Sequence, residues 1–186
     1  MSKRLVPELP FPPYSYVTGQ FPHPTRDRLG HSFGHPHRSV PPLEPERWQA
    51  SQEYLFALDL FNHGYYWEAH EAWEELWHAC GRTGVVADFL KGLIKFAAAG
   101  VKVREGRSEG VRRHARRAIE LLQVVQRAIG VDDFCGLNLQ QLVANAEQLA
   151  NDPPVAAQTK VPVEIVFDFQ LEPQSTTGRI VETDPR

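Results

Sequence analysis

The sequence predicts an all-α protein: an antiparallel bundle of about five helices, preceded by an extended proline- and histidine-rich arm and followed by a strand-like C-terminal extension. Two observations predict this fold. Apolar residues recur at helical spacing over residues 46–151. The segments between these stretches are short, which favours antiparallel neighbours. The chain is therefore expected to divide into the arm (1–45), a helical bundle domain (46–151) and an extended segment (152–186).

The arm is marked by its composition. It holds ten of the fifteen prolines and four of the eight histidines, His23, His31, His35 and His37. Because proline lacks an N–H group and restricts the residue before it, most of the arm is excluded from helix. Its aromatic residues favour an arm that packs over the folded part, since disordered chains contain few aromatics.

Capping signals set the expected ends of the helices. Pro45 suits a first turn, and Gly64 suits the residue just past a helix end. Ser108 is a candidate N-cap, and Asn138 followed by Gln141 has the pattern of a capping pair. The helices are expected over about 45–62, 66–80, 85–104, 108–130 and 138–151.

Residues 160–171, KVPVEIVFDFQL, alternate between apolar and polar side chains, which predicts a strand. A lone strand leaves its N–H and C=O groups unpaired. Its predicted partner is either the N-terminal stretch YSYVTG (14–19) or a second copy of the chain. A homo-oligomer through this strand, or through helix faces, is therefore the partner that the sequence favours.

The overall balance of charge argues against two classes of partner. A net charge of −3 and a pI near 6.2 provide no general attraction to nucleic acid or to an anionic membrane. No apolar run is long enough to span a bilayer. Cys80 and Cys135 lack zinc-type spacing and are too few for a disulfide scaffold. With no signal-peptide pattern at the N-terminus, a cytoplasmic protein is expected.

The stretch YYWEAHEAWEELW concentrates the residues best suited to chemistry. On a helical wheel, Glu68, Glu71 and Glu75 fall opposite the apolar arc, while His70 and Glu74 fall on its border, one turn apart. This HExxE pair can share a divalent metal, or the carboxylate can orient the histidine as a base. His70, Glu71 and Glu74 are therefore the candidate catalytic residues. A structural hydrogen bond is the simpler alternative.

Two protein ligands are too few for a tightly bound metal. If the arm lies over the bundle, His23 or His31 can reach the edge formed by His70 and Glu74 and complete a site of three ligands. The expected cofactor of such a site is a divalent metal. The alternative is a proline-bent arm whose histidines stack on the surface or donate to backbone carbonyls.

Basic residues crowd the third and fourth predicted helices. Lys95 lies on a narrow polar stripe of an otherwise apolar helix, and seven arginines occupy residues 104–127. A solvated face, or ion pairs with the acidic second helix, explains these charges more simply than nucleic acid does. A phosphate-bearing ligand is the sharper alternative, with Lys95, Arg112 and Arg116 as its predicted contacts.

The run FALDLFNHGYYWEAHEAWEELW, followed by DFLKGLIKFAAAGVKVREGR, resembles a bacterial and archaeal family catalogued as domain of unknown function 309. The resemblance implies a small all-helical bundle and implies no activity. The family's recurrent His-Glu and nearby Glu fall on His70, Glu71 and Glu74. Many members carry Gln at the position of Lys95, which argues against a catalytic role for that lysine.

Asn62 and Tyr66 lie in the FN-G-Y part of the same run and join the predicted ligand-binding residues. Three functions follow, in order of support. The first is an interaction or scaffold module, since no strong catalytic motif occurs. The second is a metal-dependent enzyme, for example a hydrolase, with His70 and Glu74 in its site and the arm as a lid. The third is an anion- or phosphate-binding protein that uses arginines of the fourth helix.

Overall fold

The computed structural model describes residues 3–36, 39–156 and 160–174, and it confirms the all-α prediction. The helices are η1 (Pro45–Ala50), α1 (Gln52–Asn62), α2 (Tyr66–Ala79), α3 (Val85–Arg104), α4 (Ser108–Ile129) and α5 (Leu139–Asn151). Two short strands, β1 (Asp133–Phe134) and β2 (Leu137–Asn138), pair antiparallel between α4 and α5. No described helix is both long and apolar enough to cross a membrane.

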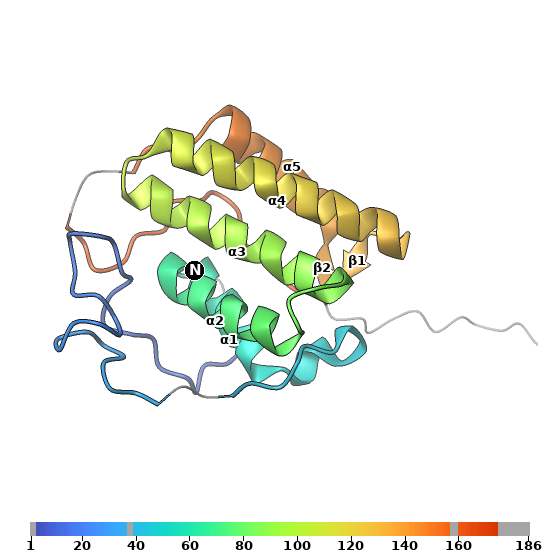
Figure 1. Cartoon of the computed structure of the whole chain (residues 1–186). Helices are drawn as coiled ribbons and strands as arrows, with labels where there is room; N and C mark the ends of the chain where they lie inside the picture. Colours follow the sequence, from blue (N-terminus) through green and yellow to red (C-terminus); the bar gives the residue numbers. More distant parts are fainter. Residues whose placement is uncertain (1–2, 37–38, 157–159, 175–186) are drawn as a thin grey trace, which may run out of the picture.

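The helix α3 lies at the centre of the bundle, with α1 and α2 on one side and α4 and α5 on the other (Figure 1). Successive helices pack against one another, because the connections between them are short. Two glycines of α3 allow this close packing. A Cβ atom on Gly100 would lie 2.5 Å from the ring of Tyr66, and one on Gly92 would lie 2.9 Å from Leu122. Larger side chains there would push α2 and α4 away from α3.

Most helix ends agree with the capping signals. Gly130 closes α4 in the left-handed conformation, with a φ of 67°. The side-chain oxygen of Asn138 accepts a hydrogen bond from the N–H of Gln141 at 2.8 Å and caps α5. Ser108 is the first residue of α4, so the N-cap position falls on Arg107 instead.

The predicted first helix is two helices. The 3-10 helix η1 ends at Ala50, and Ser51 takes an extended conformation with a φ of −82° and a ψ of 98°. The Ser51 hydroxyl accepts a hydrogen bond from the N–H of Tyr54 at 3.3 Å, which caps α1. A serine hydroxyl can hydrogen-bond to nearby backbone groups in place of the helical hydrogen bonds. Serine therefore favours a cap position over a helix interior.

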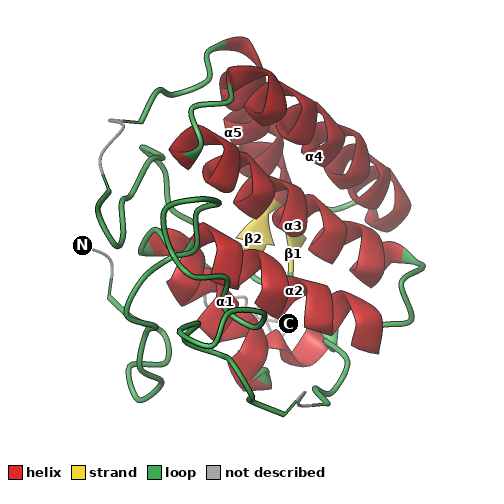
Figure 2. Ribbon diagram, turned by 60° about the vertical axis from the view of Figure 1, so that its left-hand side comes forward, coloured by secondary structure: helices red, strands yellow, loops and turns green. Residues whose placement is uncertain are grey.

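The β1–β2 hairpin has no counterpart among the predicted elements (Figure 2). Its two loop residues, Cys135 and Gly136, have φ values of 49° and 77°. Two consecutive positive φ values are typical of the tight type I′ turn that joins short strands. The ring of Phe134 packs edge-on against Phe89 at 5.1 Å between centroids, so the hairpin covers one end of the core.

The arm packs over α1 and α2, as its aromatic residues predict (Figure 2). Asp59 of α1 is buried, and it accepts hydrogen bonds from the N–H groups of Leu5 at 2.8 Å and Val6 at 3.0 Å. Farther along the arm, Val17 is buried as well. Of the four histidines of the arm, His37 lies outside the described residues.

Residues 160–171 are extended but form no β-strand, contrary to the prediction. Among the described residues, one backbone hydrogen bond joins this segment to the predicted partner YSYVTG, from the N–H of Ser15 to the C=O of Pro162 at 2.9 Å. Val161 and Ile165 are exposed, although the alternation places them on the buried side. Helix side chains take the place of a neighbouring strand: Asn62 hydrogen-bonds to the backbone of Leu171, and Tyr66 to the N–H of Val166.

Candidate functional site

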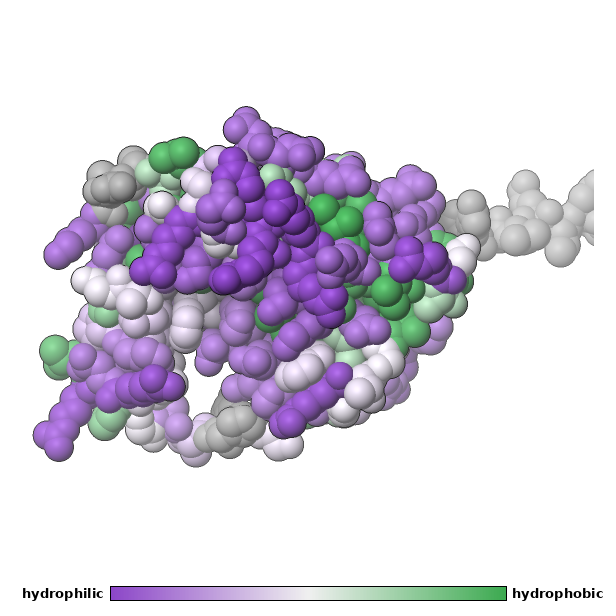
Figure 3. Space-filling model, turned by 45° about the horizontal axis from the view of Figure 1, so that its top comes forward, coloured by the Kyte–Doolittle hydropathy of each residue, from purple (hydrophilic) through white to green (hydrophobic). Residues whose placement is uncertain are grey.

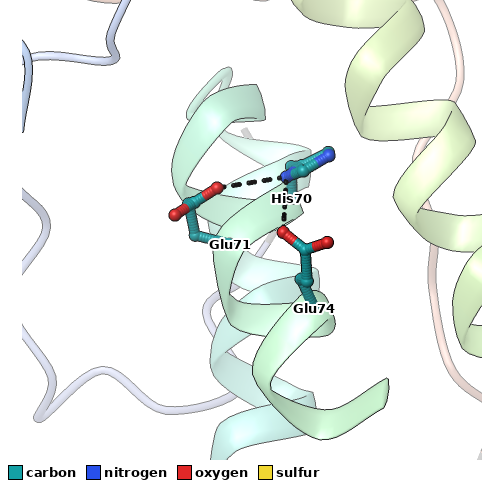
Figure 4. A group of neighbouring side chains, drawn as sticks. All are labelled: His70, Glu71 and Glu74. Carbon is teal, nitrogen blue, oxygen red and sulfur yellow. Dashed lines mark hydrogen bonds and ion pairs between the residues drawn. The ribbon is translucent and has the colours of Figure 1, made fainter. Parts of the chain in front are cut away.

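Three side chains of the predicted site gather on one side of α2: His70, Glu71 and Glu74, the α2 cluster (Figure 4). The Nδ1 atom of His70 lies 3.3 Å from Oε1 of Glu71 and 4.0 Å from Oε2 of Glu74. Residues 70 and 74 meet because they are one helical turn apart. The ring of Trp67 stacks against His70 at 6.0 Å between centroids, which helps to fix the orientation of the imidazole.

The α2 cluster has the composition of a cation site. One ligand atom from each residue lies within 4.8 Å of the others, and the described residues contain no second group of this kind. Because Zn²⁺ lies about 2.0–2.2 Å from nitrogen and oxygen ligands, the three atoms have to move closer to one another to hold it. The side chains are 24%, 49% and 38% exposed, so a cation held here keeps positions open to solvent.

The arm does not complete the α2 cluster. Nε2 of His31 lies 3.1 Å from Oε1 of Glu68, which is on the preceding part of the same helix. His23 packs against the rings of Tyr16 and Trp67, at 5.0 and 5.7 Å between centroids. Both predicted arm ligands are therefore close to α2, but the structure brings neither of them to the cluster.

Glu68 is buried, although the helical wheel places it on the outward side of α2. Its side chain is 7% exposed, because the arm lies over it. Its Oε1 atom accepts a hydrogen bond from the N–H of Tyr16 at 3.0 Å in addition to the contact with His31. A wheel describes one helix in isolation, so it cannot show what covers that helix.

A second candidate site is an open groove between α3 and α4, with a volume of about 460 Å³. We call it the cationic groove, and its lining residues are Lys95, Arg113, His114, Arg116, Arg117 and Glu120. The residues from α4 recur at spacings of three and four, which places them on one face of the helix. Strongly hydrophilic residues gather over the exposed side of α4 (Figure 3).

Among the described residues, much of the positive charge in the cationic groove is not engaged in ion pairs with carboxylates. Arg117 forms an ion pair with Glu120 at 2.6 Å. By contrast, Lys95, Arg113 and Arg116 form no ion pair with a carboxylate among the described residues. Within the described part of the chain, three cations of the groove therefore have no carboxylate within ion-pair distance.

The surroundings of the groove disfavour further positive charge. Burial lowers the pKa of Lys95, and the neighbouring Lys91 and Arg117 lower it further. Burial also lowers the pKa of His114 to about 4, with added repulsion from Lys95 and Arg113. A bound anion would relieve the part of this effect that comes from repulsion between cations.

The α2 cluster and the cationic groove share one face of the bundle. Burial and nearby cations lower the pKa of Lys95, and Glu74 acts in the opposite direction. Likewise, His70 adds to the burial and the cations that lower the pKa of His114. His70 and Glu74 of the α2 cluster are therefore near enough to the groove to influence Lys95 and His114 electrostatically.

The other predicted ligand contacts are engaged by the chain itself. Asn62 and Tyr66 hydrogen-bond to the backbone of the C-terminal segment, and burial raises the pKa of Tyr66 to about 12. Arg112 pairs with Glu109 at 2.9 Å and lies outside the groove. Of the five predicted ligand contacts, only Lys95 and Arg116 line the groove.

Four residues of the groove are absent from the predicted contacts: Arg113, His114, Arg117 and Glu120. A helical spacing signal was available, since Arg113 lies three residues before Arg116 and four before Arg117. The position of Lys95 across the groove is a consequence of how α3 packs against α4, which no spacing within α4 reveals.

Residues 54–114 match the model of a protein family described as a domain of unknown function (DUF309). The matched region begins inside α1, includes α2 and α3, and ends inside α4. This match confirms the resemblance found in the sequence, and it covers the α2 cluster together with Lys95, Arg113 and His114. A comparison with curated proteins finds no match.

Proposed function

We propose that this chain, which carries a DUF309 domain, binds a phosphate-class anion in its cationic groove. The observation that carries the proposal is that Lys95, Arg113 and Arg116 line one open groove without carboxylate partners among the described residues. A guanidinium group can donate two parallel hydrogen bonds to a phosphate group, and the ammonium group of lysine adds a compact positive charge.

The shape of the groove favours a small anion or the phosphate group of a larger ligand. The groove is open to solvent. Arg113 and Arg116, which form no ion pair with a carboxylate among the described residues, are exposed on its rim. Lys95 and His114 are partly buried and face the anion from deeper positions. The chain has a net charge of −3, so this positive potential is local rather than a property of the whole surface.

Two other functions have less support from the geometry. A metal-dependent hydrolase with the arm as lid needs an arm histidine at the α2 cluster, and His31 is held by Glu68 instead. An interaction module loses one of its supports, the unpaired strand, because residues 160–171 form no strand. Cation binding by the α2 cluster alone remains a second candidate, supported by its three converging ligand atoms.

Isothermal titration of the purified chain with pyrophosphate tests anion binding. We expect binding that weakens as salt increases and that falls at least about tenfold in Arg113→Gln and Arg116→Gln, since each removes a charged hydrogen bond. Arg127→Gln is the matched control, because it removes the same charge from an exposed position of α4 outside the groove. An equal loss in all three variants, or no binding to the unaltered chain, contradicts the proposal.

A further inference from the structure

The C-terminal segment is bound to the bundle as an extended peptide is bound to a receptor. Asn62 exchanges two hydrogen bonds with the backbone of Leu171: Nδ2 donates to the C=O at 3.0 Å, and Oδ1 accepts from the N–H at 2.7 Å. The hydroxyl of Tyr66 accepts a hydrogen bond from the N–H of Val166 at 3.0 Å. These bonds recognise main-chain groups, so they hold an extended chain in register without a β-sheet.

Alternate side chains of the segment pack against apolar side chains of the bundle. Phe167 is 7% exposed and stacks on Phe61 at 5.6 Å between centroids. Leu171, four residues later, is 2% exposed. Between them, Phe169 meets the ring of Phe96 edge-on at 5.8 Å. The buried Phe167 and Leu171 and the partly buried Phe169 follow the period of two that an extended chain presents to one surface.

The helical domain is shaped for a close approach of this backbone. Gly64, in the turn between α1 and α2, has a φ of 87° and faces the segment. A Cβ atom at this position would lie 2.6 Å from the carbonyl oxygen of Glu164. We call Phe61, Asn62, Gly64, Tyr66 and Phe96 the cradle. The whole cradle lies within the region matched to DUF309, whereas the segment that it holds lies outside that region.

We infer that the cradle is a binding site for an extended peptide with apolar residues at alternate positions, and that it accepts residues 160–174 of a second copy of this chain. The contacts described above join the cradle to the segment, and none of them requires the covalent connection through α5. An identical segment from another copy offers the same groups. Residues 160–174 of the same chain have a higher effective concentration at the cradle than those of a second copy. Exchange between copies therefore requires the binding of the chain's own segment to be weakened.

A pair of full-length variants tests exchange between copies. Phe167→Asp weakens the segment and leaves the cradle intact, whereas Asn62→Ala weakens the cradle and leaves the segment intact. Native mass spectrometry of the mixture is expected to show a one-to-one heterodimer, because one intact cradle can receive one intact segment. Each variant alone is expected to remain a monomer. A mixture that stays monomeric, with both variants helical by circular dichroism, overturns the inference.

A second experiment covers the case in which a variant does not fold. A protease site introduced at 155–156, where Val155 is 84% exposed, allows the folded chain to be cut before the segment. A fluorescent peptide of residues 160–174 is then expected to replace the cut segment, whereas the same peptide with Leu171→Asp is not. A bundle that remains folded after cutting but binds neither peptide overturns the inference. Both experiments are independent of anion binding.

Discussion

The imidazole of His31 and the carboxylate of Glu68 form a buried contact of 3.1 Å between the N-terminal arm and α2. The two side chains are 8% and 7% exposed. The same carboxylate oxygen accepts the N–H of Tyr16 at 3.0 Å, so one residue of the bundle holds two parts of the arm. A histidine of the arm therefore serves to fasten the arm, and it does so beside the α2 cluster rather than within it.

Glu68→Ala is expected to loosen the arm and to lower the free energy of unfolding by about 1–3 kcal/mol, because it leaves buried donors of the arm without an acceptor. Urea unfolding measures the loss, and hydrogen exchange is expected to show faster exchange at the amide of Tyr16. Glu71→Ala is the control on an exposed position of the same helix, with an expected change within about 0.5 kcal/mol. Equal losses in the two variants would show that the arm is held by other contacts.

The stability of the fold is expected to decrease as the pH falls from about 6.5 to about 4, in part through His114. Burial and neighbouring cations lower the pKa of His114 to about 4 in the folded state, whereas its ordinary value is 6.5. Above both values His114 is neutral in both states and adds no pH dependence. Between them the unfolded chain binds a proton that the folded chain does not, so stability is lost.

His114→Gln removes this proton uptake. Urea unfolding near pH 7 and near pH 5 is expected to show a smaller loss of stability on acidification in the variant than in the unaltered chain. The comparison cancels the carboxylates, which titrate in both proteins. An unchanged pH dependence would contradict the lowered pKa of His114.

Gly64→Ala is expected to destabilise the protein more than Gly81→Ala. Both glycines have positive φ, of 87° and 77°, so each substitution has a backbone cost of about 1–2 kcal/mol. Only at Gly64 does the new Cβ collide with another segment, 2.6 Å from the carbonyl oxygen of Glu164. Thermal unfolding is expected to show an additional loss of about 1–3 kcal/mol at Gly64. Equal losses would mean that the segment moves aside without cost.

The α2 cluster is expected to bind Zn²⁺ in preference to Mg²⁺, because one imidazole nitrogen and two carboxylate oxygens suit a borderline metal better than a hard one. Titration calorimetry is expected to show zinc binding that is lost in His70→Ala. His78→Ala, at an exposed histidine of the same helix, controls for nonspecific binding to imidazole. Retained binding in His70→Ala would place the metal elsewhere.

The helices were predictable because their signals are local. Gly130 and the pair Asn138 and Gln141 mark helix ends through bonds within a few residues of themselves. The break at Ser51 and the hairpin at 133–138 were missed for the opposite reason. A single serine gives a weak signal inside a helical pattern, and strands of two residues are too short to show a period of two.

The candidate sites were predictable only in part. His70 and Glu74 meet because they are one turn apart on one helix, and their spacing of four residues in the sequence predicts this contact. The cationic groove joins Lys95 of α3 to arginines of α4, so its composition depends on how two helices pack. The roles of Asn62 and Tyr66 depend on a segment about a hundred residues later, which no local pattern connects to them.

The sequence by itself determined most of the helices, several of their caps and the meeting of His70 with Glu74, because each depends on residues within one or two turns of one another. Only the tertiary structure decided which polar residues remain accessible. Glu68 is covered by the arm, and Asn62 is occupied by the C-terminal segment, whereas Arg113 and Arg116 form no ion pair with a carboxylate in the part of the chain that the structure describes. The physical reason is that the burial and the ion pairing of a side chain depend on contacts between segments far apart in the sequence. The apolar period of a single helix carries no information about those contacts.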